Sequence, residues 1–374
     1  MRVENKNRKG VLRYLWYPLL AVNFLTILFL LLSVISWYVS PAKITIIAYL
    51  GMAFPFIYVI NIAFLFFWTI CFQWRYALIS FISLIICISP ALTYFPIHFK
   101  TKEIPENCIK VMSYNVRAFN WNKKLAAADN PILTYIRDCD PDIVCIQEYT
   151  AVTDKMKRNT NDIKKVLSKY PYFSFINLWP SRPTVDHGLA CFSKYPILSA
   201  TKIPVESSGT NGSVLYKIKV NNKIISVINN HLESNQLTSA DKQLYRDLLK
   251  DTNRQNIDNV AHNIKNKLGS AFQKRAPQAN LISKWIKEQD TDGVIVCGDF
   301  NDTPISYTYK TIKGDLIDSY ANTGFGPGIT YHENHFWFRI DFIMHSRNIK
   351  SYNTTVGKVK YSDHYPVWTY LQID

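Results

Sequence analysis

Residues 294–304 read VIVCGDFNDTP, an apolar run that stops on Asp299 and is followed at once by Phe300 and Asn301. A buried strand that ends on a carboxylate or an amide brings that group to the rim of a sheet, where ligands bind in open α/β proteins. The stretch therefore predicts a core strand with reactive groups at its end.

Four other runs share this construction, because each is an apolar stretch bounded by Asp, Glu, Asn or His. They are IKVMSYNVR at 109–117 with Asn115, DIVCIQEYT at 142–150 with Glu148, IISVINNHLES at 224–234 with His231, and KYSDHYPVW at 360–368 with Asp363 and His364. Five strand ends that supply carboxylates, amides and imidazoles are typical of a divalent-metal site that cleaves phosphoesters.

The first hundred residues have a different composition. The intervals 14–42, 44–74 and 76–99 contain no Lys, Arg, Asp or Glu. Each exceeds the roughly 20 apolar residues that cross a hydrocarbon core. Buried core helices or a cleavable signal peptide are the alternatives, but a signal peptide has a single short apolar stretch. The sequence predicts three transmembrane helices, at about 15–39, 44–70 and 77–97.

Two further features of these segments bear on their role. Pro18, Pro55 and Pro90 lie within them, and membrane helices tolerate proline. The predicted helices contain no charged residue, which argues against a transporter module, because ion and substrate paths through a membrane use such residues.

The basic N-terminus predicts the orientation of the helices. Five Lys or Arg precede the first helix against Glu4 alone, and such an excess marks the cytoplasmic side. Three crossings then place the rest of the chain on the outer face, periplasmic or extracellular. We therefore expect an integral, multi-pass membrane protein. Its segments are a basic cytoplasmic tail at 1–13, the transmembrane region at 14–99, a linker at 100–107 and a catalytic domain at 108–374.

The net charge of the whole chain is +15, and the acid-poor first hundred residues contribute part of it. The remaining excess favours an anionic partner, such as a phosphate diester or an acidic membrane surface. A solvated basic surface without a ligand is equally consistent with it.

The cysteines predict buried free thiols. Of seven in the chain, Cys145, Cys191 and Cys297 lie inside apolar runs. An odd count without CxxC spacing argues against a zinc site and against a disulfide framework.

Between the rims, strand-like runs alternate with amphipathic stretches. Leu237–Leu268 is charged on most faces and predicts a surface helix, and Pro277–Glu288 predicts a separate amphipathic helix. Strands that lack uniform helical crossovers predict mixed sheets rather than one parallel sheet. The loops that we expect to select the substrate are Trp179–Asp186, Ser207–Ser213, residues 237–268 and residues 321–338.

Hydrolysis of a phosphate ester needs a Lewis acid, a deprotonated water in line with the leaving group, and a proton source for that group. Mg²⁺ is a hard ion that keeps several waters and takes only one or two protein carboxylates. We therefore expect Mg²⁺, with Mn²⁺ as a substitute, at Glu148 with Asn115 beside it and Asp363 as a further ligand.

Two histidines and Asp299 would supply the proton chemistry. Asp341, in FRIDFIMHS, offers a carboxylate that would orient His364 and raise its pKa. His231 would contact the phosphate or protonate the leaving oxygen. Asp299 would accept the proton of water, with Asn301 fixing its geometry.

Each of these residues has a simpler interpretation on its own. A carboxylate after a strand, such as Glu148 or Asp299, is ordinarily a cap or turn residue, and His187 before Gly188 is ordinarily a loop histidine. The ordered conjunction of all five rims favours the catalytic interpretation.

The motifs together resemble the endonuclease/exonuclease/phosphatase superfamily, which includes deoxyribonucleases, neutral sphingomyelinases and inositol polyphosphate 5-phosphatases. The segments that carry the resemblance are SYNVR, CIQE, HGLACFSKYPI, NNHLES, CGDFNDTP, RIDFIMHS and SDHYPV, within residues 108–374. The resemblance implies a four-layer αββα sandwich with two mixed β-sheets, and Mg²⁺-dependent cleavage of a phosphoester.

The resemblance also implies roles for individual residues. Asn115 and Glu148 match the metal side of the family's site. Asp299 and Asn301 match the pair that positions the attacking water and the phosphate. Arg117 is a substrate contact by its charge alone.

The histidines match in the same way. His231 matches the first active-site histidine of the family, and Asp341 with Asp363 and His364 matches its terminal Asp–His system. His187 matches a motif at the edge of the site whose role varies, and we expect it to contact the substrate. The chain departs from the soluble nucleases in its N-terminal helices, and it has no dense Lys/Arg helix that would follow a nucleic-acid backbone.

The sequence as a whole predicts a membrane-anchored, Mg²⁺-dependent phosphoesterase in which a metal-activated water attacks a phosphodiester. Its expected partners are the lipid bilayer and a phosphoester substrate, either a lipid headgroup or another small phosphodiester. Nucleic acid is the second candidate, which would make the chain a surface-tethered endo- or exonuclease, and no protein partner can be inferred. A catalytically idle binding domain on a membrane anchor is the alternative of another class, and the intact set of site residues disfavours it.

Overall fold

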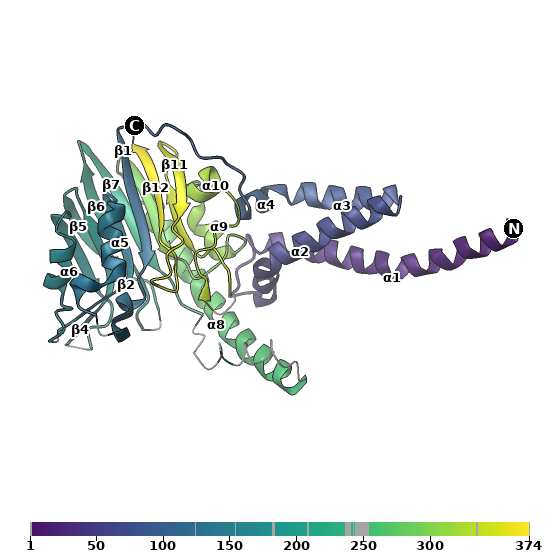
Figure 1. Ribbon diagram of the computed structural model, residues 1–374, viewed down its shortest axis with the longest axis horizontal. Coiled ribbons are helices and arrows are strands. Elements are labelled where there is room, and N and C mark those ends of the chain that lie inside the picture. The colour runs from purple at the N-terminus through teal and green to yellow at the C-terminus, as the bar shows by residue number, and fades with distance from the viewer. Residues whose placement is uncertain are drawn as a thin grey trace.

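The computed structural model describes residues 2–123, 125–153, 155–181, 184–207, 209–235, 241, 243, 254–333 and 336–373. Within them, a group of apolar helices projects from one side of an α/β domain (Figure 1). Most of the first half of the predicted surface helix at 237–268 lies outside the described residues.

Four helices precede the α/β domain. They are α1 (Arg2–Ile35), α2 (Thr45–Ile70), α3 (Trp74–Ile86) and α4 (Ile88–Tyr94). Among the described residues, two helical stretches are long and apolar enough to cross a membrane: Trp16–Ile35, with a mean hydropathy of 2.5, and Thr45–Ile70, with 2.1. The bent pair α3 and α4 adds a third if the pair forms one span.

The predicted span at 77–97 corresponds to two helices, because the chain bends by 60° between α3 and α4. In a continuous helix the ring of Pro90 would clash with the carbonyl of Ile86, four residues earlier. α3 ends at Ile86, so Pro90 falls in the first turn of α4, where proline is tolerated. Pro18 and Pro55 lie inside α1 and α2, as the sequence predicts.

Helices α1 to α3 have polar groups at their centre and an apolar exterior. Asn23 Oδ1 accepts hydrogen bonds from Trp68 Nε1 (2.9 Å) and Ser80 Oγ (3.1 Å), and Asn61 Nδ2 donates to the carbonyl of Thr26 (3.2 Å). The exposed apolar side chains of the exterior include Phe24, Leu28, Phe56, Phe66, Ile82 and Ile86. This distribution is unfavourable in water and suits a hydrocarbon surrounding.

Two six-stranded sheets form the α/β domain. In spatial order, the first sheet contains β11 (Ile349–Val356), β12 (Val367–Ile373), β1 (Cys108–Asn115), β2 (Ile143–Val152), β4 (Val185–Ser193) and β3 (Tyr172–Asn177). The second contains β5 (Ile197–Ile203), β6 (Gly212–Val220), β7 (Lys223–His231), β8 (Gly293–Asp299), β10 (Asp341–His345) and β9 (Ile317–Asp318). Both sheets are mixed, as predicted, because β1–β2 and β7–β8 pair in parallel and the strands that flank each pair run antiparallel to it.

Helices cover the outer faces of both sheets. Those on the first sheet are α5 (Pro131–Cys139) and α6 (Thr160–Val166), with the 3-10 segments η1 (Arg117–Lys123) and η2 (Ala127–Asp129). Those on the second are α8 (Arg254–Lys287) and α9 (Tyr307–Lys313), and the short α10 (Ser319–Thr323) contacts β10 and β11. The order of layers is αββα, which confirms the predicted sandwich.

The helix predicted to begin at Pro277 is wrong in its start, because α8 runs from Arg254 to Lys287 with Pro277 inside it. Phe272, Ala276, Ala279 and Ile282 are all buried on one face that continues across the proline. Burial of this face outweighs the hydrogen bond that the proline removes.

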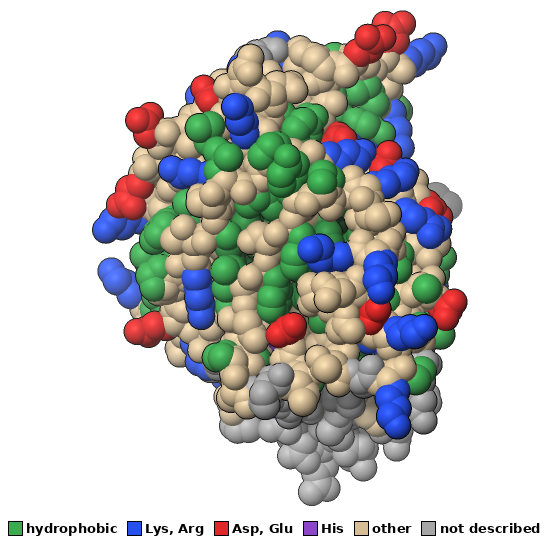
Figure 2. Space-filling model, turned by 90° about the vertical axis from the view of Figure 1, so that its left-hand side faces the viewer, with side chains coloured by type: hydrophobic (Ala, Val, Ile, Leu, Met, Phe, Trp, Pro, Cys, Tyr) green, Lys and Arg blue, Asp and Glu red, His purple; other side chains and the backbone are tan. Residues whose placement is uncertain are grey.

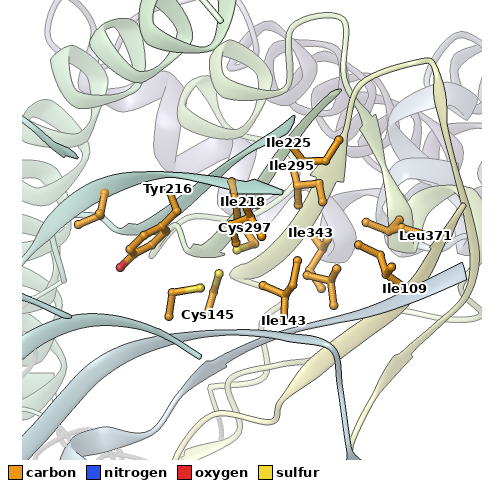
Figure 3. Packing of buried hydrophobic residues seen from close by; sticks show 14 of the residues in the cluster. Ile109, Ile143, Cys145, Tyr216, Ile218, Ile225, Ile295, Cys297, Ile343 and Leu371 are labelled. Atoms are coloured by element: carbon orange, nitrogen blue, oxygen red, sulfur yellow. The ribbon is translucent and has the colours of Figure 1, made fainter. Parts of the chain in front are cut away.

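Apolar side chains from both sheets fill the space between them, as Figure 3 shows for Ile143 and Cys145 from β2 and for Ile295 and Cys297 from β8. All seven cysteines are free thiols, and Cys145, Cys191 and Cys297 are fully buried. This outcome agrees with the prediction of core cysteines.

The apolar helices pack directly on the α/β domain. Trp37 Nε1 donates to the carbonyl of Pro304 (2.8 Å), and Ser36 Oγ donates to that of Ile305 (2.9 Å). Gly51 of α2 lies so close that an added Cβ would be 2.3 Å from the carbonyl oxygen of Ile305. The segment after β8 is therefore held against α1 and α2.

Contacts also hold the linker and α4. Asn353 exchanges hydrogen bonds with the backbone of Thr101, at 2.8 and 2.9 Å. The buried Arg339 pairs with Asp318 (2.8 Å) and donates to the carbonyl of Thr93 in α4. The catalytic domain thus meets the helices through packed surfaces as well as through the chain that joins them.

The face of the α/β domain that points away from the helices has a different character. Figure 2 shows basic and acidic side chains scattered over it, with apolar groups between them. Such a mixture is typical of a surface in water.

Candidate active site

The predicted site residues meet at one rim of the sandwich. β1 ends on Asn115 and β2 carries Glu148, while β7 ends on His231 and β8 on Asp299. Because each of these two pairs is parallel, its carboxyl ends lie at the same edge of its sheet. Asn115 Nδ2 donates to Glu148 Oε1 (3.1 Å) and to Asp299 Oδ2 (3.0 Å), so one amide links the rims of both sheets.

β10 and the segment before β12 complete the cluster. Asp341, the first residue of β10, lies opposite Asp299 in the antiparallel register. His364 Nδ1 is 2.8 Å from Asp341 Oδ2, and its Nε2 is 3.6 Å from Asp299 Oδ2. His231 Nε2 is 3.7 Å from Glu148 Oε1 and 3.8 Å from Asp299 Oδ2. Asp299 therefore contacts both imidazoles.

The backbone of β2 departs from regular geometry at the site. The register with β4 shifts between Ile146 and Tyr149, and Glu148 within this bulge has a φ of 52°. Gln147 instead points between the sheets, where its Nε2 donates to Asn229 Oδ1 (2.6 Å). Bulges commonly re-aim a side chain next to an active site, and here the bulge directs Glu148 to the rim.

The turn after β8 is also constrained. Asn301 has a φ of 53°, its N–H donates to Asp299 Oδ1 (2.8 Å), and its Nδ2 donates to the carbonyl of Leu232 (3.1 Å). Gly298 has a φ of 127°, and an added Cβ would lie 2.0 Å from the carbonyl oxygen of Asn230. Both carboxylate oxygens of Asp299 are thus held by donors on a rigid turn and on β1.

Burial disfavours ionisation of Asp299 and Glu148. It raises the pKa of Asp299 to about 6, although His364 and His231 oppose the change. Burial, followed by the neighbouring carboxylate of Asp363, raises the pKa of Glu148. Such shifts are characteristic of groups that take part in chemistry.

The two histidines shift in opposite directions. For His364, burial acts to lower the pKa, but the carboxylates of Asp341 and Asp299 outweigh it and raise the pKa well above its ordinary value. Burial lowers the pKa of His231, against the opposing effect of Asp299. The site therefore favours a cationic His364 beside a neutral His231.

Arg117 and Asp363 lie at the edge of the cluster. Arg117 Nε is 3.6 Å from Asp363 Oδ2, and the guanidinium also pairs with Glu333. The Arg117 side chain is 43% exposed. Its charge is thus shared with two carboxylates while one side remains accessible.

His187 lies beside the cluster, on β4. Its Nδ1 is 2.7 Å from Thr150 Oγ1. Burial, with a smaller contribution from His231, lowers its pKa to about 4. The structure does not bring His187 into contact with Asp299 or His364 among the contacts of the described residues.

An open cavity of about 320 Å³ gives access to the cluster. The predicted site residues that line it are Glu148, His231, Asp299, Asn301, Asp363 and His364. The buried Asn115 and Asp341 contact these residues from behind.

The donor set fits a hard divalent cation. Ligand atoms of Asp299, Asp341 and His364 lie within 4.8 Å of one another, and Asp341 Oδ1 is buried without a hydrogen-bond partner. A cation would also relieve the repulsion between acids that contributes to the raised pKa of Glu148. Carboxylate and amide oxygens at this density suit Mg²⁺ or Mn²⁺.

A buried charged network next to the site was not predicted from the sequence. Arg275 of α8 is fully buried, and its Nε lies 3.3 Å from Asp302 Oδ2. Its Nη1 donates to the carbonyl of Glu233 (2.8 Å) and to Asn235 Oδ1 (2.9 Å). The GDFND and HLES motifs drew attention to Asp302 and Glu233. The sequence around Arg275 contains several Lys and Arg residues, and it does not indicate which of them is buried.

Comparisons with known proteins identify the family of the α/β domain. Residues 112–364 match the model of the Endonuclease/Exonuclease/phosphatase family, and residues 15–94 match a Domain of unknown function (DUF8431). No curated protein matches the chain.

Solved structures share the fold of the α/β domain. Humanized D. rerio TDP2 is 15% identical, with a TM-score of 0.51 over 71% of this chain and 99% of that one. An endonuclease/exonuclease/phosphatase from Bacteroides vulgatus is 17% identical, with a TM-score of 0.49 over 72% of this chain and 100% of that one. A beta toxin mutant from Staphylococcus aureus with bound magnesium ions is 18% identical, with a TM-score of 0.43 over 70% and 99%.

The family match extends from β1 through the Asp363–His364 pair and thus covers most of the chain, including every rim of the site. The chain belongs to the endonuclease/exonuclease/phosphatase family and is a hydrolase of phosphoric ester bonds.

Proposed function

We propose that this protein is a membrane-anchored, Mg²⁺-dependent phosphodiesterase. The observation that carries the proposal is the convergence of Glu148, His231, Asp299 and His364 on one open cavity, with Asp341 behind them. Burial of several acids and imidazoles together costs folding free energy. Catalysis at the open cavity that they line explains why the protein keeps them.

The metal would be held on the Glu148 side of the site. Glu148 would supply a carboxylate oxygen, and Asp363 would supply a further one. Asn115 would be a ligand only with its amide turned, because its Nδ2 donates to Glu148 and its Oδ1 accepts from the N–H of Arg117. When bound, Mg²⁺ or Mn²⁺ supplies a Lewis acid that offsets charge on the phosphoryl oxygens.

The protein's own groups would handle the protons. Asp299, fixed by Asn115 and Asn301, is placed to accept the proton of the attacking water. His364, oriented by Asp341, presents Nε2–H to a phosphoryl oxygen. His231, which the site favours as neutral, would contact the phosphate, and it would protonate the leaving oxygen only in its imidazolium form. Arg117 at the edge contacts the phosphate by charge.

Removal of the metal tests this assignment. The full chain, purified in detergent, should hydrolyse bis(p-nitrophenyl) phosphate, lose the activity in EDTA and recover it with Mg²⁺ or Mn²⁺. Asp299→Asn protein purified in parallel controls for contaminating hydrolases. Activity that survives exhaustive chelation in the wild type but is absent from the variant would overturn the metal-dependent mechanism.

The proposal includes a topology with the N-terminus in the cytoplasm and the catalytic domain at the outer face. It is supported by the basic residues before α1 and by the position of the N-terminus and the α/β domain at opposite ends of the helices (Figure 1). Reporter fusions after Asp374 test it: alkaline phosphatase should be active there, and a cytoplasmic fluorescent protein should be dark. The reverse pattern would place the site in the cytoplasm.

A further inference from the structure

The cavity that contains the catalytic groups has a second, apolar wall. It is formed by Met52, Leu268, Phe272, Phe336, Phe338 and Ile340. No carboxylate or imidazole of the cluster belongs to this wall, so hydrolysis alone does not explain it.

One residue of the wall comes from a membrane helix. Met52 lies on α2, about 10 Å along the axis from the first residue of that helix. The cavity is therefore bounded partly by the catalytic domain and partly by a helix that is apolar enough to cross a bilayer.

Packing between α2 and α8 fixes this wall in place. Ala48 of α2 belongs to one apolar cluster with Leu268 and Phe272 of α8, and Tyr49 stacks edge-on against Phe272 at 5.3 Å. Gln273 Nε2 donates to Thr45 Oγ1 (2.8 Å) at the start of α2. The apolar wall thus lies next to the start of α2.

The charges around the cavity favour one class of ligand. No Lys or Arg lies among the described residues that line it. Arg117 at the edge of the site could meet one phosphate, whereas a nucleic-acid strand would need a series of such side chains along its path to neutralise successive phosphates. A ligand with one phosphoester and an adjoining hydrocarbon part matches a cavity with one polar end and one apolar end.

We propose that this wall is a subsite for the hydrocarbon part of an amphiphilic phosphoester, namely a phospholipid that enters from the bilayer beside α2. The inference rests on the proposed function and adds the class of substrate. The phosphoester lies against Asp299 and His364, and carbon atoms farther along the chain contact Met52, Phe336 and Phe338. A volume of about 320 Å³ holds only this part of a lipid, so the remaining chain stays in the membrane.

A chain-length series tests the subsite. Alkyl p-nitrophenyl phosphates with alkyl groups of increasing length share one chromogenic leaving group and can be assayed with the full chain in amphipol. We expect kcat/KM to rise by up to about fourfold for each added CH₂ until the wall is covered. A rate that is independent of alkyl length would overturn the subsite, and no Mg²⁺-dependent hydrolysis of even the methyl ester would overturn the proposed function instead.

Paired substitutions on α2 sharpen the test. Met52→Gln keeps the length of the side chain and should lower kcat/KM for the octyl ester about tenfold while leaving the methyl ester within about twofold. Ile46→Gln is the control, because Ile46 is 59% exposed near the start of the same helix and does not line the cavity. Equal losses for both esters in Met52→Gln would show a structural role and overturn the subsite, as would plasmid DNA being cleaved more efficiently than any alkyl ester.

Discussion

The helical region and the α/β domain each contain a buried asparagine that links neighbouring elements. The two side chains differ in the charge of the groups to which they are hydrogen-bonded. Asn23, between α1, α2 and α3, accepts hydrogen bonds from the neutral donors Trp68 and Ser80. Asn115, at the rim of the sandwich, donates to the carboxylates of Glu148 and Asp299. Hydrogen bonds between neutral groups stabilise the packing of helices. Neighbouring carboxylates lower the stability of the fold, and their presence is explained by a role in catalysis. The comparison predicts that substitutions in the first region change stability and that those in the second change rate.

The largest effect is expected where the two regions meet. Arg339→Met would leave Asp318 buried without its partner and remove the donor to Thr93 of α4, at a cost of about 3–5 kcal/mol in the free energy of unfolding. Denaturant unfolding in micelles, followed by tryptophan fluorescence, measures it. Arg347→Met is the matched control, because its pair with Asp315 is exposed and should contribute nothing measurable. Similar midpoints for both variants would show that the buried pair does not join the regions.

The rim of the sandwich should show the next largest effect, in rate alone. Asp299→Asn, Glu148→Gln and His364→Ala should each lower kcat by at least about a hundredfold, the scale of a lost acid–base or electrostatic group. In chelator the melting temperature of Asp299→Asn should be no lower than that of the wild type, because the folded state disfavours this carboxylate when ionised. Asp315→Asn, on an exposed acid of the same domain, controls for general effects of charge. Near-normal turnover of His364→Ala would refute the role given to that histidine.

The Asp341–His364 pair allows a finer test of the same rim. If Asp341 acts by orienting His364, then Asp341→Asn with His364→Ala should be no slower than His364→Ala alone. A double-mutant cycle on kcat/KM with the methyl ester measures the coupling. Additive losses would mean that Asp341 acts independently of the imidazole, for example as a metal ligand.

The smallest effect is expected inside the helices. Asn23→Leu should lower stability in micelles by about 1 kcal/mol, the scale of a hydrogen bond between membrane helices. Its kcat/KM should equal that of the wild type. A loss of activity without a loss of stability would break the distinction between the two regions.

The polar residues at the strand ends were predicted well, because the end of a buried strand can be recognised from a few neighbouring residues. A run such as 294–299 must be buried, so the polar groups that follow it must reach an edge, and parallel pairing brings such edges together. The order αββα was predicted from the family resemblance alone, and the three buried core cysteines were predicted from their positions inside apolar runs.

Contacts between distant segments could not be predicted in this way. Nothing in the apolar pattern of α2 distinguishes Met52, which lines the cavity, from Phe56, which is 66% exposed. The burial of Arg275 likewise depends on Glu233 and Asp302, which are brought to it only by the folded sheet. The break before Pro90 could not be predicted from the proline alone, because Pro18, Pro55 and Pro277 lie inside helices that continue across them.

The close contact at Gly51 limits which segments of other proteins could replace the N-terminal helices. The backbone of Gly51 contacts the turn that follows Asp299 so closely that a Cβ at this position would overlap both the carbonyl oxygen of Ile305 and the hydroxyl of Ser36. A foreign N-terminal segment fused at residue 100 would remove the contacts to Pro304 and Ile305, whereas Asn301 and Asp302 would keep Leu232 and Arg275 as partners within the α/β domain. Replacement of the helices would therefore have to supply a new surface for residues 304 and 305.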